Sequence, residues 1–277
     1  MGDSSFNLDL LKERVFSPVD LFWVKKNGKK VLLVGRGDFL DHTRLEKYFS
    51  FSLVTEGSLD HLNEIKSLFE NLKEVESDRE RYVIAGDITK EFCAHLNEYS
   101  EEDLIILGEE LFFDLPQDDI SLFSKMKSDY MERASLCGML SVLMALGFGY
   151  YGFNFLKDLY HSHFAVTKIH GLSTLEIDQL ENYRTSDDLS LDKNIFEKTT
   201  TALSYRFESK AVKKIAYFML ERRDGRGPNK LNENELSDLE MIVSEVQRTV
   251  SFVKPFWKES KVDCSFSRVE FRMKDCG

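Results

Sequence analysis

The sequence predicts an α+β protein, with a small α+β domain at the N-terminus followed by an all-α helical bundle. Short apolar runs separated by glycine-containing turns fill roughly the first sixty residues, as in a small sheet. From about Ile120 onward, apolar residues recur at helical spacing and turn residues become rare. We therefore expect an α+β regulatory or interaction domain at residues 1–118 and a helical domain at residues 119–277.

Three runs of strand length predict the sheet: residues 20–26 (DLFWVKK), 29–37 (KKVLLVGRG) and 51–57 (FSLVTEG). Asn27-Gly28 separates the first two runs and predicts a hairpin with a type I′ turn, in which both central residues have positive φ. The glycines of Gly35-Arg36-Gly37 predict a further turn rather than a dinucleotide-binding loop, because the third glycine of that motif is missing.

The rest of the N-terminal region mixes helical and strand patterns. Residues 39–49 (FLDHTRLEKYF) suit a short amphipathic helix, and residues 59–75 have the length of a full helix. Residues 81–87 (RYVIAGD) and 103–113 (DLIILGEELFF) are apolar runs that we expect to be strands.

The uncharged segment 136–156 is long enough to span a bilayer. Its glycines and the sequence Phe-Gly-Tyr-Tyr-Gly favour instead two buried helices joined by a turn, without membrane insertion. Ser173 and Glu176 predict a capped helix start, and the apolar spacing of residues 236–250 predicts a helix with one buried face. Residues 261–273 suit a terminal strand or a frayed tail.

Composition limits the class of partner. A net charge of -11 and a pI near 5.2 oppose binding to nucleic acid or to anionic membrane surfaces. The four cysteines form no CxxC pair, which indicates reduced thiols, and the N-terminus lacks the pattern of a signal peptide. We therefore expect a cytoplasmic protein.

Residues 219–229 (MLERRDGRGPN) carry the most informative motif. This segment resembles the signature HHExxDGxGYP of the HD-GYP cyclic-di-GMP phosphodiesterases, a bacterial family. The acidic and glycine positions match, whereas apolar residues occupy the places of the paired histidines, Met219 and Leu220. Upstream, Lys168 matches the lysine of the family's HDxGK motif, and Phe164-Ala165 stand in place of its His-Asp pair.

The order of the neighbouring segments is similar to the family as well. Tyr183 lies near an expected histidine, and Gln247 lies near the last expected aspartate. The run from Pro18 to Phe49 resembles a small domain that precedes some HD-GYP modules. The resemblance covers about two thirds of the chain and implies an HD-type helical bundle.

Catalysis in this family depends on clustered metal ions, which activate a bridging water and hold the scissile phosphate. The resemblance implies at least three histidine ligands beyond the HD motif, yet no histidine follows His170. We therefore expect a pseudo-enzyme without metal or other cofactor, in which the former ligand positions have become apolar core. His161, His163 and His170 could form a different metal site, but hydrogen-bonded histidines near a helix end are the favoured interpretation.

Three hypotheses follow. In the first, the protein acts through protein contacts in cyclic-di-GMP signalling; in the second, it is a receptor that binds the dinucleotide without hydrolysis. The third is a metal-dependent phosphodiesterase with unorthodox ligands. The cationic and acidic positions that could hold a ligand or partner are Lys168, Arg222, Arg223, Asp224 and Arg226. The alternative for the motif segment is an ordinary loop with surface charges, among them Glu221.

Overall fold

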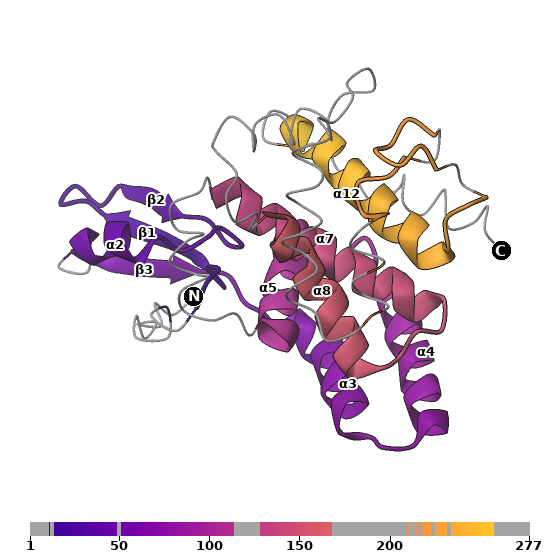
Figure 1. The fold of residues 1–277 in the computed structure, drawn as a ribbon. Coiled ribbons are helices and arrows are strands. Elements are labelled where there is room, and N and C mark those ends of the chain that lie inside the picture. The colour runs from indigo at the N-terminus through magenta and orange to yellow at the C-terminus, as the bar shows by residue number, and fades with distance from the viewer. Residues whose placement is uncertain are drawn as a thin grey trace.

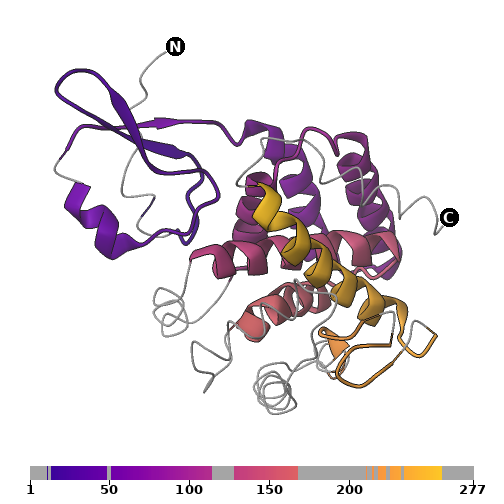
Figure 2. The same cartoon turned by 90° about the horizontal axis from the view of Figure 1, so that it is seen from above.

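The computed structural model describes residues 14–48, 51–113, 128–167, 218–222, 225–231 and 234–257, together with Leu11, Lys210 and Lys214. Figure 1 shows a small sheet set to one side of a group of helices, and Figure 2 shows the same separation from above. The protein is therefore α+β, as the sequence predicts.

The sheet has three antiparallel strands in the order β2-β1-β3: β1 (Asp20–Val24), β2 (Lys30–Val34) and β3 (Leu53–Glu56). All three fall within the predicted runs. The hairpin between β1 and β2 is also confirmed, but its turn is not type I′, because Gly28 has a φ of 77° and Asn27 has no positive φ. The N–H of Gly28 donates to the carbonyl of Lys25 at 2.8 Å and closes the turn. The turn has one residue with a left-handed backbone, and glycine adopts that conformation without strain.

One face of the sheet has its own small core. Leu21 on β1 packs with Leu40 and with Leu45 of α2 (His42–Leu45), which continues as the 3-10 helix η1 (Glu46–Tyr48). This turn of helix lies where the amphipathic segment 39–49 predicts it.

The largest error of the sequence analysis concerns the two apolar runs expected to be strands. Residues 81–87 lie inside α4 (Asp78–Ala94), and residues 103–113 coincide closely with α5 (Glu101–Phe112). The helix α5 begins with a capping box, in which Ser100 accepts from the N–H of Asp103 and Asp103 accepts from the N–H of Ser100. Nearly every side chain from Asp103 to Glu109 is buried, so the segment shows no polar face from which a helical period could be read.

The remaining helices agree with their predicted positions. The helix α3 (Asn63–Glu74), preceded by the 3-10 helix η2 (Asp60–Leu62), lies within residues 59–75, and α12 (Asp238–Trp257) includes residues 238–250. The uncharged segment forms parts of α7 (Ser128–Gly147) and α8 (Phe153–Thr167), joined by the predicted turn. Among the described residues, no helix is both long and apolar enough to cross a membrane.

Tyr160 of α8 holds three helices together. Its side chain is fully buried beside two glycines, Gly108 of α5 and Gly138 of α7. Its hydroxyl bonds to Ser135 Oγ at 2.8 Å, and Ser135 Oγ in turn donates to the carbonyl of Ile105 at 3.1 Å. The phenol therefore joins α8 to α5 and α7 by both packing and hydrogen bonding.

The main core crosses the predicted boundary between the domains. Buried side chains of α3, α4 and α5 share one apolar cluster with those of α7, α8 and α12. The predicted boundary near Pro116 lies outside the described residues, and the division at residue 118 stays a prediction. What the core shows is that α3, α4 and α5 pack with the helical half, while the sheet and α2 have a separate core.

Carboxylates of α5 anchor the sheet to the helices. Glu109 Oε1 accepts from the backbone N–H of Val15 at 2.5 Å and of Phe16 at 3.3 Å. Asp103 forms an ion pair with Arg36, and its Oδ1 lies 3.0 Å from Nε2 of His61. Phe16 bridges to Phe39 in the chain that leaves the sheet, and its ring contacts the ring of Phe113.

The contacts of Tyr160 predict opposite effects of two Gly→Ala substitutions. A Cβ at Gly138 would lie 2.6 Å from Tyr160 Cδ2 and 2.9 Å from the Tyr160 carbonyl, whereas a Cβ at Gly86 of α4 meets nothing within 4 Å. We expect Gly138→Ala to lower the free energy of unfolding by roughly 1–3 kcal/mol. Gly86→Ala should raise it by up to about 1 kcal/mol, since alanine is the better helix former. Denaturant unfolding of both variants measures this, and equal stabilisation would contradict the described packing.

Burial raises the pKa of Glu109 to about 7, against the opposing effect of the two N–H donors and Arg14. The folded state then binds a proton more tightly than the unfolded state, so this group stabilises the fold at low pH, and that contribution is lost as pH rises from 4.5 toward 7. We expect the stability of the wild type relative to Glu109→Gln to fall by roughly 2 kcal/mol between about pH 5.5 and about pH 7.5. Urea unfolding of both proteins at the two pH values tests this, and a constant difference would contradict it.

Candidate functional site

The structure brings several of the predicted positions into the main core. Phe164, at the C-terminal end of α8, is fully buried, and Met219 and Leu220 are 1% and 5% exposed. All three belong to the same apolar cluster. Other predicted positions fall outside the described side chains, namely Ala165, Lys168, Tyr183, Arg223 and Asp224.

Gln247 connects α12 to the end of α8. Its side chain is buried, and its Nε2 donates to Nδ1 of His163, also buried. A neutral imidazole that accepts at Nδ1 carries its proton on the other ring nitrogen. Sequence reasoning placed Gln247 near an expected metal ligand but did not foresee that it would bind the neighbour of Phe164.

Glu221 organises the loop that follows Leu220. The carboxylate is buried, and its Oε1 accepts from the backbone N–H of Asn229 at 2.7 Å. Burial raises the pKa of Glu221, while hydrogen bonds from Asn229 and from the backbone of Leu231 lower it. Glu221 and Arg222 are 3% and 5% exposed, which contradicts the alternative that the charged residues of this segment are simple surface charges.

Gly227 allows this loop to lie against Glu221. A Cβ at Gly227 would lie 2.3 Å from Glu221 Oε2 and 2.8 Å from the backbone nitrogen of Arg222. Gly225, with a φ of 74°, and Lys230, with a φ of 57°, make two left-handed turns on either side. Arg226 is exposed, so of the two described arginines of the motif segment, Arg222 and Arg226, it is the one that an external ligand could reach.

The polar side chains described in the preceding paragraphs differ in chemistry. They are the imidazole of His163, the amide of Gln247 and the carboxylate of Glu221, and all three are buried. Each is a close neighbour in sequence or a hydrogen-bond partner of a residue next to the apolar Phe164, Met219 and Leu220. No group of three or more histidine, cysteine, aspartate or glutamate side chains that could hold a metal ion occurs within the described residues. Compared with known proteins, the chain matches no family model, no curated protein and no solved structure.

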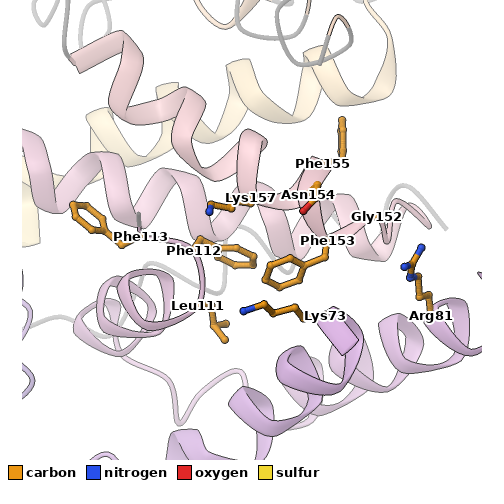
Figure 3. A pocket seen from close by; sticks show the side chains of 10 residues that line it. All are labelled: Lys73, Arg81, Leu111, Phe112, Phe113, Gly152, Phe153, Asn154, Phe155 and Lys157. Carbon is orange, nitrogen blue, oxygen red and sulfur yellow. The ribbon is translucent and has the colours of Figure 1, made fainter. Parts of the chain in front are cut away.

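A second feature was missed by sequence reasoning. A groove of about 620 Å³ lies between the end of α3, the start of α4, the end of α5 and the start of α8. Figure 3 shows its lining, in which three cations accompany four phenylalanines. The charged and aromatic lining residues include Lys73, Arg81, Phe112, Phe153, Phe155 and Lys157. The signal was not readable in the sequence, because these residues come from four separate helices.

The buried carboxylate predicts a stability effect at the loop. Glu221→Ala leaves the N–H of Asn229 without its acceptor, and we expect it to lower the free energy of unfolding by roughly 1–3 kcal/mol. The matched control is Lys230→Ala, an exposed residue of the same loop, which should change stability by less than about 0.5 kcal/mol. Thermal unfolding measures both variants. Equal melting temperatures of Glu221→Ala and the wild type would contradict a structural role of the carboxylate.

Proposed function

We propose that this protein is a non-catalytic relative of the HD-GYP phosphodiesterases that acts through protein contacts in bacterial cyclic-di-GMP signalling. The observation that supports the proposal is the burial of Phe164, Met219 and Leu220 in one apolar cluster. Resemblance to the family implies metal ligands at these three positions. Apolar side chains there pack with one another and supply neither the charge nor the lone pairs that a metal ion requires.

The family assignment itself depends on the motif segment at residues 219–229. Its glycine and glutamate matches have clear structural roles in this chain, since Gly227 lies against Glu221 and Glu221 holds the loop. A loop held in this way can persist after catalysis is lost, because its stability does not depend on a metal. This is the reason to interpret the motif as an inherited structure.

The second candidate is a receptor that binds cyclic-di-GMP without hydrolysing it. The exposed position of Arg226 favours this alternative, because a guanidinium group can make two hydrogen bonds to a phosphate. In that case the loop would be a binding surface as well as a structural element. The two candidates differ in whether the dinucleotide itself is bound.

Three measurements on the full-length protein test these candidates. We expect less than one tenth of an equivalent of iron, manganese or zinc by elemental analysis after reconstitution with each metal, roughly the background of adventitious binding. We also expect no hydrolysis of cyclic-di-GMP with the metal added. Stoichiometric metal together with turnover would overturn the proposal.

Calorimetric titration with cyclic-di-GMP separates the first candidate from the second. Absence of binding at high micromolar ligand supports protein contacts alone. Binding that weakens in Arg226→Ala, but not in the control Lys90→Ala on the exposed side of α4, supports the receptor. The metal content and the hydrolysis assay test the absence of catalysis, and their outcome does not depend on whether the dinucleotide binds.

A further inference from the structure

The groove between α3, α4, α5 and α8 concentrates positive charge in an acidic protein. The chain has 48 acidic and 37 basic residues, yet the described residues that line the groove include Lys73, Arg81 and Lys157 and no carboxylate. Arg81 Nη1 lies 3.6 Å from Asp78 Oδ1, and the side chain of Asp78 is 81% exposed. The groove therefore attracts anions locally, although the protein as a whole is negatively charged and repels them.

Phenylalanine rings form the floor of the groove between the cations. Phe112 and Phe153 lie with their ring centroids 5.4 Å apart, and Lys73 Nζ lies 5.8 Å from the centroid of Phe153. Figure 3 shows Lys73 and Lys157 approaching this ring pair from opposite sides. Because Phe112 is only 1% exposed, the ring surface that the groove presents comes from the half-buried Phe153 and Phe155.

The opposite end of the groove is also cationic and aromatic. Arg81 is held in place by the bond from its Nε to the carbonyl of Val75 at 2.7 Å, so the Nε does not take part in binding a ligand. Phe155 lies at this end and contacts the ring of Tyr150, which is 39% exposed. Tyr82 of α4, 63% exposed, contacts the ring of Tyr151.

We propose that this groove binds a small organic anion that carries an aromatic ring and a phosphate, sulfonate or carboxylate group. The volume of about 620 Å³ lies within the range of about 300–1,000 Å³ that is usual for small-molecule sites. The ring of the ligand stacks on the half-buried rings of Phe153 and Phe155, and its anionic group bonds to the ammonium and guanidinium groups. The proposal is independent of the relation to HD-GYP enzymes, because none of these residues is at a former metal-ligand position or in residues 219–229.

The test uses anilinonaphthalene sulfonate, an aromatic sulfonate whose fluorescence rises in apolar surroundings, as the probe. We expect saturable binding to the full-length protein, weakened by added salt because the attraction is partly electrostatic. The double variant Lys73→Glu with Lys157→Glu should raise the Kd of the dye by about tenfold or more. The matched control, Lys47→Glu with Lys90→Glu, makes the same change in net charge at exposed lysines outside the groove and should leave the Kd within about twofold.

Competition identifies the chemistry of the ligand. Phenyl phosphate should displace the dye at lower concentration than inorganic phosphate, because it supplies both the ring and the anion. Absence of saturable dye binding, or equal Kd values for the two double variants, overturns the proposal. Displacement by an acidic apolar peptide but not by phenyl phosphate overturns it in favour of a peptide site. Thermal unfolding of each variant excludes loss of folding as the cause, and the milder Lys73→Gln provides a second test if the double variant does not fold.

Discussion

The packing of Tyr160 against Gly108 and Gly138 is the contact on which the helical part depends. Because neither position has a side chain, α5, α7 and α8 can approach closely, and the ring of Tyr160 occupies the space where a Cβ would lie. A buried hydroxyl without a partner would be destabilising, and Ser135 provides that partner. The position of α8 then fixes the features at its two ends, the aromatic floor of the groove and the buried junction with α12.

The helix α5 has a second role, which explains its unusual burial. Its apolar side chains join the main core, while Asp103 and Glu109 bind the segments that lead into and out of the sheet. A buried carboxylate is unfavourable unless donors surround it, and the two backbone N–H groups at Glu109 lower that penalty only in part. The attachment of the sheet therefore depends on the hydrogen-bond geometry at Glu109 and on whether this carboxyl group is charged.

The sequence was sufficient for the elements whose signals are local. The strands, their hairpin, the turn between α7 and α8 and the apolar face of α12 all follow from turn residues and periodicity. The two errors, α4 and α5, both arose from short apolar runs, whose length alone does not separate a strand from a helix segment. The run in α5 is buried, whereas in α4 Tyr82 and Val83 are exposed. The sequence Ser100-Glu101-Glu102-Asp103 contained the evidence against a strand, since Asp103 completes a capping box with Ser100.

The site was less predictable than the fold, because its chemistry depends on tertiary packing. Glu221 and Arg222 stand in a run of charged residues, and no local pattern indicates that they would be buried while Arg226 is exposed. The groove is a stronger example, because Lys73 and Lys157 are 84 residues apart in the sequence and share a ring pair only in the folded chain.

The two ends of α8 explain how a binding function and an apolar core can coexist in one helix. Lys157 lies in the groove, and Phe164 lies seven residues later in the core, about 10 Å along the helix axis. Phe164 belongs to the main core, which also includes the buried face of α12. The surroundings of Lys157 are set by α3, α4 and α5 instead, so the chemistry of this end does not depend on the packing at the other. Selection could therefore change one end of this helix without changing the other.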